Sequence, residues 1–408
     1  MRASTPTPEA REPEETPTTL AGAFSLYERA GGVLIPVAAT LLAFTIGGLV
    51  VVATGSNPFS AYKAIFEGTG LNWFFPWVTG DARTEAAGDL QQTLIITTTL
   101  ICTALAVAFA FRCGMFNIGG QGQYWMGLIA ALYVGMQFPD LPLALHVTIS
   151  ILAAILAGAV WGGIAGLLKA GVGAHEVIST IMLNWIAIWV GRWLVELGGP
   201  LQGDEPSTPR SNDIADSAKL SEVWNWGALQ PLHAGIFIAL FALVVYHYLL
   251  NRTTLGYEVR AVGFNPEAAR YGGISVGKNY FLALAIAGGF AGLGGSMDML
   301  GWKFHVAEND FPVGTAGFIG IAVALLGRNK AIGILFAALL FGGLQVGTSP
   351  RQLDPEVFNP ELATNLATII QALIILFVGA ELLIVAVWRA GRRVPLLGQR
   401  RTAPGLQE

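Results

Sequence analysis

The chain has 408 residues, of which 53% are hydrophobic and only 12% are charged. Soluble domains carry about 25% charged residues, so this composition excludes an ordinary soluble protein and indicates a polytopic membrane protein. The net charge of −4 gives no sign of nucleic-acid binding. The two cysteines, Cys102 and Cys113, lie within or at the end of one apolar segment, where neither a disulfide framework nor a metal set is expected. We therefore predict no metal and no cofactor.

The first stretch of the chain, MRASTPTPEAREPEETPTTL, is rich in Pro, Thr and Glu and lacks the order of a cleavable signal peptide. We expect a disordered tail over residues 1–30, a transmembrane domain over 31–390 and a basic tail over 391–408. Apolar segments in the membrane domain predict an all-α fold with about ten transmembrane helices. They cover residues 31–54, 91–111, 119–136, 143–168, 176–196, 230–250, 279–300, 313–327, 331–348 and 364–388.

The charges of the loops predict how the chain crosses the membrane. The loop 251–278, the turn 328–330 and the tail 391–408 are basic, whereas the loops 197–229 and 349–363 are acidic. Short basic loops stay on the cytoplasmic side. The basic segments and both termini are therefore predicted to be cytoplasmic, and the acidic loops to lie outside.

Two similar motifs open the third and the eighth apolar segments. They read FNIGGQGQYWMG and FPVGTAGFIG and share a Phe-x-x-Gly-x-x-Gly spacing. Because one segment starts inside and the other outside, the match predicts an inverted repeat of segments 2–5 and 7–10, which is typical of transporters. The alternative is chance, since such glycine spacing is common in membrane helices. The eighth segment is about 22 Å long as a helix, so we expect an extended lead-in and a half-length helix.

Polar residues within the apolar segments are candidates for a transport pathway, because polar groups there are costly and often functional. Glu176, Thr180 and Asn184 are spaced four apart and share one helix face. That face could line a pathway or could join helices through hydrogen bonds. Glu381 is interpreted as an interfacial anchor. The candidate pathway residues are Asn117, Gln121, Glu176, Thr180, Asn184, Gly314 and Gly317.

The loop sequence GYEVRAVGFNPEAARYGGISVGK predicts a short helix outside the membrane. Asn265 can cap it, Pro266 fits its first position, Glu267 suits its positive end, and Gly272 can end it. A helix of about two turns is marginal alone in water. We therefore expect it to dock, either on an ATPase subunit or on its own bundle.

No residue pattern in the chain indicates catalysis. The sequence GGISVGKN imitates a phosphate-binding loop, but Asn279 replaces the hydroxyl that would hold magnesium. The five histidines form no zinc motif and no nucleophile–base pair. We expect a transport protein and not an enzyme. It would act as a channel, run on an ion gradient, or use ATP hydrolysis by another subunit.

Four stretches closely resemble one protein family. They are FNIGGQGQ, HEVISTIMLNWIA, AVGFNPEAARYGGI and GFIGIAVALLGRNKAIG, within roughly residues 90–350. They resemble permease subunits of bacterial ABC importers for nucleosides, the basic-membrane-protein-linked branch of the ribose and branched-chain amino acid permease superfamily. The resemblance implies a type II importer fold in the bacterial cell membrane. It also implies three partners: an ABC ATPase subunit, a second permease that is a paralogue or a copy, and an extracytoplasmic substrate-binding lipoprotein.

The resemblance further implies roles for particular residues. In such permeases the matching loop contains a coupling helix that contacts the ATPase, here Gly263, Asn265, Pro266, Glu267, Ala268, Ala269, Arg270 and Gly273. The chain departs from the family pattern at Gln121, where an acid is expected. The resemblance also implies that the chain forms half of a translocation pathway for nucleosides. The alternatives are a permease for simple sugars such as ribose, or an ion-coupled secondary transporter.

Overall fold

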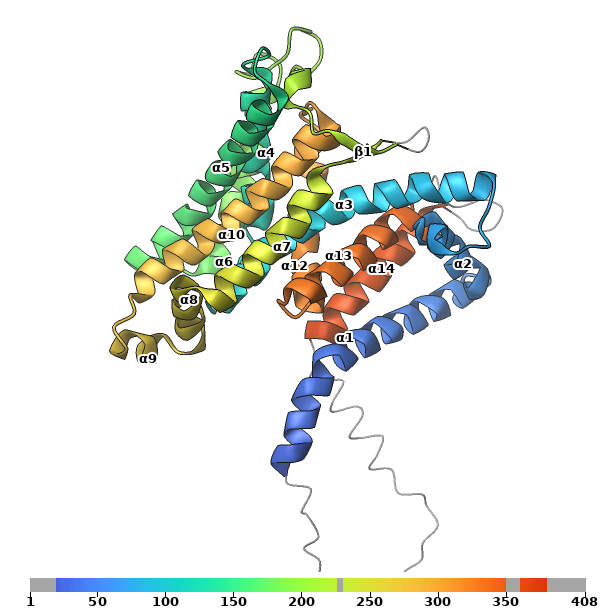
Figure 1. The fold of residues 1–408 in the computed structure, drawn as a ribbon, viewed down its shortest axis with the longest axis horizontal. Helices are drawn as coiled ribbons and strands as arrows, with labels where there is room; N and C mark the ends of the chain where they lie inside the picture. The colour runs from blue at the N-terminus through green and yellow to red at the C-terminus, as the bar shows by residue number, and fades with distance from the viewer. Residues whose placement is uncertain (1–19, 226–229, 350–359, 380–408) are drawn as a thin grey trace, which may run out of the picture.

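The computed structural model describes residues 20–225, 230–349 and 360–379, which form a bundle of helices (Figure 1). In the described part, β1 (Glu222–Trp224) pairs with β2 (Leu232–His233) in one small antiparallel sheet. The α-helices are α1 (Leu20–Ala53), α2 (Pro58–Gly68), α3 (Asp81–Arg112), α4 (Gly120–Met136), α5 (Leu143–Val172), α6 (Glu176–Val195), α7 (Gly235–Arg252), α8 (Thr254–Phe264), α9 (Pro266–Tyr271), α10 (Val276–Asp298), α11 (Asp310–Val313), α12 (Ala316–Leu326), α13 (Ala331–Gly347) and α14 (Pro360–Gly379). Shorter turns are η1 (Leu71–Phe74), η2 (Asp216–Ala218) and the π-helix η3 (Met299–Lys303).

Every predicted apolar segment overlaps an α-helix of this bundle. Within the described residues, six helical segments are long and apolar enough to cross a membrane: α1, α3, α5, α6, α7, and α10 with η3. The described parts of α12, α13 and α14 are apolar but shorter. The protein is therefore an all-α, multi-pass membrane protein.

The structure differs from the prediction mainly where helices start. Residues 20–30 belong to α1 and are not part of a tail, because the run LAGAFSLYERA consists mostly of residues that tolerate or favour a helix. α3 begins at Asp81, before its predicted apolar segment, and α2 precedes it. The remaining N-terminal tail, the tail 391–408, most of the loop 349–363 and Glu381 lie outside the described residues.

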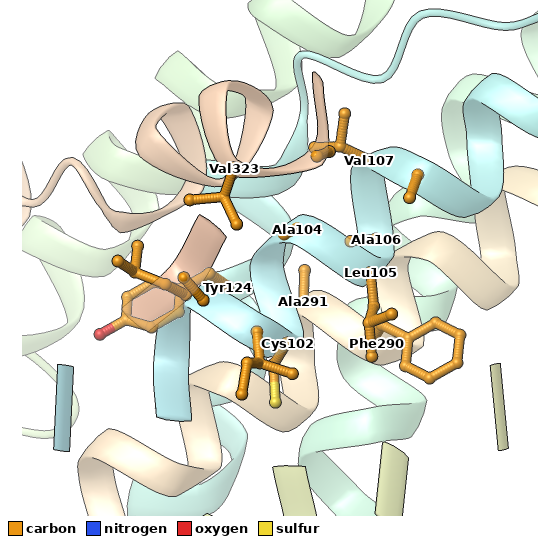
Figure 2. Packing of buried hydrophobic residues seen from close by; sticks show 14 of the residues in the cluster. Cys102, Ala104, Leu105, Ala106, Val107, Tyr124, Phe290, Ala291 and Val323 are labelled. Carbon is orange, nitrogen blue, oxygen red and sulfur yellow. The ribbon is translucent and has the colours of Figure 1, made fainter. Parts of the chain in front are cut away.

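α3 and α10 form the centre of the bundle. In their most apolar windows 83% and 72% of the residues are buried, against 22% for α5 and 28% for α6. Figure 2 shows Cys102 and Leu105 of α3 among the buried side chains that include Phe290 of α10 and Val323 of α12. The outer helices therefore turn apolar side chains towards the bilayer, while α3 and α10 are shielded from it.

The most extensive contact between two described helices joins α5 and α10. Glycine makes it possible, because a Cβ at Gly158 would lie 2.2 Å from the carbonyl oxygen of Gly288. A Cβ at Gly292 would likewise lie 2.3 Å from the carbonyl oxygen of Ala154. Small residues at such interfaces let backbones approach closely. α4 joins the same contact through Gly127, since a Cβ added at this residue would lie 2.3 Å from the Cα of Gly292.

The two ends of the bundle differ in character. At one end, called the hairpin end here, the loop before β1 covers the ends of α4 and α5, and the hairpin of β1 and β2 lies beside η3 and α3 (Figure 1). At the other end, called the basic end, lie α8, α9 and the turn between α12 and α13. There Arg112 donates a 3.0 Å hydrogen bond to the carbonyl oxygen of Asn329. The predicted basic segments 251–278 and 328–330 therefore lie at the same end.

Candidate functional site

α9 is a six-residue helix in the loop between α7 and α10. The Oδ1 of Asn265 accepts hydrogen bonds from the backbone N–H groups of Glu267 (3.0 Å) and Ala268 (3.1 Å). Pro266 is its first residue, and Gly272 is its C-cap. The structure therefore confirms the predicted position and caps of this helix.

The surface of α9 is largely free of contacts with the rest of the described chain. Phe264, just before the helix, and Tyr271, its last residue, are both 94% exposed. Glu267 and Arg270 are also exposed and form an ion pair at 3.5 Å, whereas Ala269 is buried. Large aromatic side chains that remain uncovered at a surface are typical of binding sites.

α8 is absent from the sequence-based prediction. The Oγ1 of Thr253 caps it by accepting a 3.0 Å hydrogen bond from the backbone N–H of Gly256. Val259 and Val262 are fully buried. The cap followed by Leu255, Val259 and Val262 at helical spacing is the signal that could have revealed it.

The end of α8 packs on the turn between α3 and α4. A Cβ at Gly263 would lie 2.3 Å from the carbonyl oxygen of Arg112. A Cβ at Gly114, where φ is +73°, would lie 3.1 Å from the carbonyl oxygen of Gly263. Glycine suits both positions, because no side chain separates the two backbones. The turn leads directly into α4, so a short link joins α9 to the start of α4.

The N-termini of α4 and α12 meet inside the bundle. The Oε1 of Gln121 accepts a 2.7 Å hydrogen bond from the backbone N–H of Gly317. A Cβ at Gly317 would lie 2.3 Å from the backbone nitrogen of Gln121. Gly314 also lies beside Gln121, since a Cβ added at Gly314 would lie 3.1 Å from the Nε2 of Gln121. Gln121 is fully buried, so the two helix starts are sealed against each other.

The predicted half-length helix in the eighth segment is confirmed. α12 has 11 residues, which corresponds to about 16 Å, and its start lies inside the bundle, where Gly317 contacts the fully buried Gln121. The predicted lead-in is extended only at Gly314, where φ is −62° and ψ is 124°. Before it comes the short helix α11, which begins with an acidic residue, Asp310, at its positive end.

Two asparagines hold the start of α4. The Oδ1 of Asn117 accepts from the backbone N–H of Gly119 at 2.9 Å, and the Oδ1 of Asn184 accepts from that of Gly122 at 2.7 Å. The Nδ2 of Asn184 donates to the carbonyl oxygen of Ile118 at 2.8 Å. Because the first N–H groups of a helix lack partners within it, these bonds stabilise a helix that begins inside the bundle.

The three residues predicted to share one face of α6, Glu176, Thr180 and Asn184, do not all contact the same part of the bundle. Thr180 is fully buried, and a Cβ at Gly119 would lie 3.0 Å from its Cβ. Glu176 instead forms a 2.8 Å ion pair with Lys169. The structure thus gathers six predicted pathway residues around the starts of α4 and α12 and places Glu176 apart from them. The six are Asn117, Gln121, Thr180, Asn184, Gly314 and Gly317.

Asp298, at the end of α10, is a buried acid that the sequence-based candidates did not include. Its carboxylate accepts hydrogen bonds from Tyr124 (2.6 Å), from Trp302 (3.0 Å) and from Thr99. It is only 6% exposed and joins α3, α4 and α10. An acid within the apolar segment 279–300 is itself the signal, because charged residues in membrane segments are rare and often functional.

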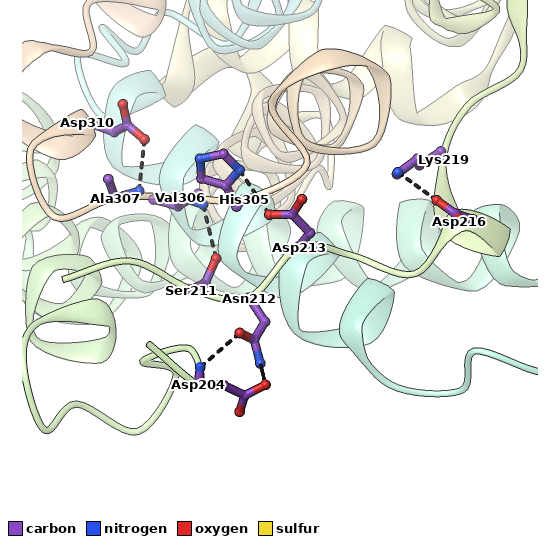
Figure 3. Close-up of polar contacts among 10 residues, drawn as sticks. All are labelled: Asp204, Ser211, Asn212, Asp213, Asp216, Lys219, His305, Val306, Ala307 and Asp310. Carbon is purple, nitrogen blue, oxygen red and sulfur yellow. Dashed lines mark hydrogen bonds and ion pairs between the residues drawn. The ribbon is translucent and has the colours of Figure 1, made fainter. Parts of the chain in front are cut away.

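The hairpin end has an ordered surface. Ser211 donates its backbone N–H to the carbonyl oxygen of Val306 (2.9 Å), and the Ser211 Oγ accepts from the Val306 N–H (3.0 Å) (Figure 3). The ring of His305 lies 3.2 Å from the carboxylate of Asp213. The predicted outer loop is therefore fixed to the segment that follows η3.

The arrangement is suited to mechanical coupling. Among the described residues, no group of three or more His, Cys, Asp or Glu side chains is placed to hold a metal ion. Cys102 and Cys113 are both buried and free. What the geometry offers is a continuous connection from an exposed surface helix, through the turn at Gly114, to two helix starts inside the membrane bundle.

A multi-pass helical bundle with two helix starts meeting inside it and an exposed helix at one end is an arrangement suited to membrane transport. Residues 90–379 match the family model described as branched-chain amino acid transport system / permease component, and the chain belongs to this family. Its members are permease components, so the protein is a transport subunit and not an enzyme.

Curated relatives resemble the chain over most of its length. A guanosine ABC transporter permease protein of Bacillus subtilis is 36% identical over 87% of this chain and 95% of the relative. A nucleoside ABC transporter permease protein of Lactococcus lactis is 34% identical over 86% of this chain and 92% of the relative. A glucose ABC transporter permease protein of Haloferax volcanii is 35% identical over 84% of this chain and 86% of the relative. No solved structure matches the chain.

Proposed function

We propose that the chain is the permease subunit of an ABC importer for nucleosides, forming half of the translocation pathway while a separate subunit hydrolyses ATP. The two relatives named for guanosine and for nucleosides support this cargo. The observation that carries the proposal is the exposed surface of α9. A permease that binds an ATPase needs such a surface, whereas an ion-coupled secondary transporter does not.

The proposed contact with the ATPase subunit is the segment from Gly263 to Gly273. Its exposed aromatic rings, Phe264 and Tyr271, would fill pockets of the partner, as aromatic anchors do in protein interfaces. The ion pair of Glu267 and Arg270 lies on the same helix and would fix its orientation.

The proposed route of coupling runs through backbone contacts. A displacement of α9 moves the end of α8, where Gly263 touches the turn at Gly114. That turn precedes Asn117 and the start of α4. A shift of α4 then breaks or forms the hydrogen bond between Gln121 and Gly317. Two discrete arrangements of this contact would correspond to inward-open and outward-open states.

The packing of the helices supports an inverted repeat. In it, α3, α4, α5 and α6 correspond in turn to α10, α12, α13 and α14. Under this correspondence, the contact of α4 with α10 is equivalent to the contact of α12 with α3, and both contacts exist. The pairs α4–α6 and α12–α14 are also both in contact. The two motifs with matching glycine spacing lie at the starts of α4 and α12. We propose ten membrane crossings arranged in this way.

The pathway itself is proposed to lie beside the starts of α4 and α12, between this chain and a second permease. Asn117, Gln121, Thr180 and Asn184 are at most 2% exposed in the described conformation. They would therefore reach a solute only when the contact between α4 and α12 opens. Glu176 would act elsewhere, by holding the start of α6 to Lys169.

The charges of the two ends support a sidedness. Short basic segments favour the cytoplasm, so the basic end and both termini are proposed to be cytoplasmic in a bacterial cell membrane. The hairpin end would then face outwards. Its ordered loop, with Asp213 and Asp216, would receive the substrate-binding lipoprotein (Figure 3).

One experiment tests cargo and energy source together. Cells that produce the full set of subunits take up labelled guanosine, uridine, ribose or glucose, with intact ATPase or with an ATPase that cannot hydrolyse ATP. We expect ATPase-dependent nucleoside uptake. ATPase-dependent uptake of sugar alone would favour the second candidate, which the glucose permease relative supports. Uptake that persists without ATP hydrolysis and collapses with an ionophore would contradict an ABC importer.

A second experiment tests the docking surface. Phe264→Ala with Tyr271→Ala, and separately Glu267→Arg, should reduce recovery of the ATPase in a pull-down from detergent, because they remove the proposed anchors or reverse a charge. Tyr133→Ala is the matched control, since Tyr133 is 53% exposed but lies on α4. Full ATPase recovery and full uptake in the variants of the loop would disprove docking at α9.

A further inference from the structure

A cavity of about 860 Å³ lies between α1, α7 and α13. Its apolar wall includes Val37 and Leu41 of α1 and Phe336 and Leu340 of α13. The proposed coupling route and pathway run through α4, α6, α8 and α12, so this wall has no role in them. α1 itself packs against α14 and α2, which leaves its other side open to the cavity.

Cations border the cavity at the basic end. Arg112, Arg260 and Lys330 all line it, and none of its lining residues is acidic. Within the described residues, none of these three cations forms an ion pair. Arg112 donates to a backbone carbonyl, and so does Arg260, through its Nε to Gly256 at 3.2 Å. Each guanidinium has five donors, so these bonds position the groups and leave donors for a ligand.

The dimensions of the cavity match one leaflet of a bilayer. From Lys330 to Leu340, α13 rises about 15 Å at the usual rise per residue, which is half of a hydrocarbon core of about 30 Å. The wall is accessible from the membrane side, since Leu41 is 64% and Phe336 is 65% exposed. Charge lies at one end and apolar surface runs away from it, as in a phospholipid.

We propose that this cavity binds one anionic phospholipid of the leaflet at the basic end. The phosphate of its headgroup lies among Arg112, Arg260 and Lys330, and its acyl chains lie along Val37, Leu41, Phe336 and Leu340. Basic pockets between membrane helices favour such headgroups. An anionic lipid fits better than a zwitterionic one, because the latter adds a further cation to a place that offers no carboxylate.

Native mass spectrometry of the assembled transporter tests the proposal. The complex, with the full-length chain and its partner subunits, is titrated with phosphatidylglycerol or with phosphatidylcholine of the same acyl chains. We expect phosphatidylglycerol to bind tightly and phosphatidylcholine to bind more weakly. The double variant Arg260→Gln, Lys330→Gln should weaken phosphatidylglycerol binding roughly 30-fold, since each basic residue near a membrane contributes about a factor of five.

A matched control separates this site from general attraction of lipids. Arg252→Gln removes an exposed cation of the same end that does not line the cavity, so it should retain the lipid. Phe336→Ala tests the apolar wall without changing charge, and it should weaken both lipids. Equal binding of the two lipids by the unmodified complex would overturn the proposal, as would an unaltered affinity in the double variant. So would binding of inorganic phosphate by the lipid-free complex that is lost in the double variant while neither lipid is retained, because the site would then take a free phosphate.

The partner permease provides a final test. Because the cavity lies between α1, α7 and α13, away from the starts of α4 and α12 beside which the second permease is proposed to lie, a lipid there should remain bound when the complete complex is assembled. If the second permease instead covers the cavity, no phosphatidylglycerol will survive assembly, and cross-links from a cysteine placed at Phe336 will reach that subunit. Either result would overturn the proposal.

Discussion

Asp298 brings a carboxyl group into the shielded centre of the bundle and uses it to join three helices. Asp298→Asn keeps the shape but replaces one acceptor oxygen by a donor, which then faces donors from Tyr124, Trp302 or Thr99. We expect a loss of about 1–3 kcal/mol in the free energy of unfolding. Thermal denaturation in detergent measures it. Asp216→Asn, at an exposed carboxylate, should leave the midpoint unchanged; equal shifts in both variants would contradict the assigned role.

His233 makes the hairpin end sensitive to acid. Its ring is buried against Gly301, and burial lowers its pKa from 6.5 to about 4. Above pH 6.5 the imidazole is neutral in both folded and unfolded chains, so it contributes nothing there. As the pH falls from 6.5 towards 4, only the unfolded chain takes up the proton. The free energy of unfolding therefore drops by up to about 3 kcal/mol.

The difference between two proteins measures this effect. His233→Gln removes the titrating group, so the midpoint of thermal denaturation should fall less steeply with decreasing pH in the variant than in the unmodified protein. Other acid-sensitive groups contribute equally to both curves. Parallel curves between neutral pH and about pH 4.5 would show that His233 carries no such penalty.

The packing of α5 against α10 depends on individual glycines within one helix. A Cβ at Gly288 would lie 2.0 Å from the carbonyl oxygen of Gly158, whereas a Cβ at Gly289 finds its nearest neighbour at 3.4 Å, in Ile155. Gly288→Ala should lower stability by about 1–3 kcal/mol, because the helices must separate. Gly289→Ala should be neutral or slightly stabilising. Denaturation midpoints in detergent that fall equally for both would contradict this packing.

Elements defined by local chemistry could be predicted, and those defined by packing could not. α9 follows from its Asn-Pro-Glu start and its glycine end, which act within a few residues. The short α12 follows from the length of its apolar run. α8 was not predicted, because Val259 and Val262, which form its buried side, are few and lie in a loop rich in charged residues. The early start of α1 reflects helix-forming residues that lie outside its apolar run.

Transport by the whole molecule should depend on the contact between the surface loop and the bundle. Gly263→Ala places a Cβ 2.3 Å from the carbonyl oxygen of Arg112, which pushes α8 away from the turn before α4. We expect the ATPase to bind as before, since Gly263 faces the turn at Gly114 and the exposed rings of the proposed contact, Phe264 and Tyr271, are kept, while uptake per ATP hydrolysed falls about fivefold or more. Reconstituted vesicles measure both rates.

Gly272→Ala is the matched control for that change. Its Cβ would meet nothing closer than 3.4 Å, and it lies in the same loop, so transport should remain coupled. If the two variants lose coupling equally, or if Gly263→Ala loses the ATPase altogether, the route through Gly114 is wrong.

The candidate site was only partly visible in the sequence. Asn117, Thr180 and Asn184 stand out as polar residues in apolar segments, and the structure brings them together. Their partners could not be foreseen, because which face a helix turns inwards depends on contacts with distant segments. The hydrogen bond from Gly317 to Gln121 joins residues far apart in the chain. Asp298 was missed although its charge within an apolar segment was a sufficient signal.

The meeting of α4 and α12 has an electrostatic consequence. Each helix start carries a partial positive charge of about half a unit, and here two of them point at the same place. The groups that cap them, Asn117, Asn184 and Gln121, are neutral amides, so they satisfy the N–H groups without cancelling this charge. Sodium ions and protons would meet a repulsive potential there, while an uncharged solute would not. We therefore expect the route past these two helix starts to admit an uncharged solute more readily than a cation.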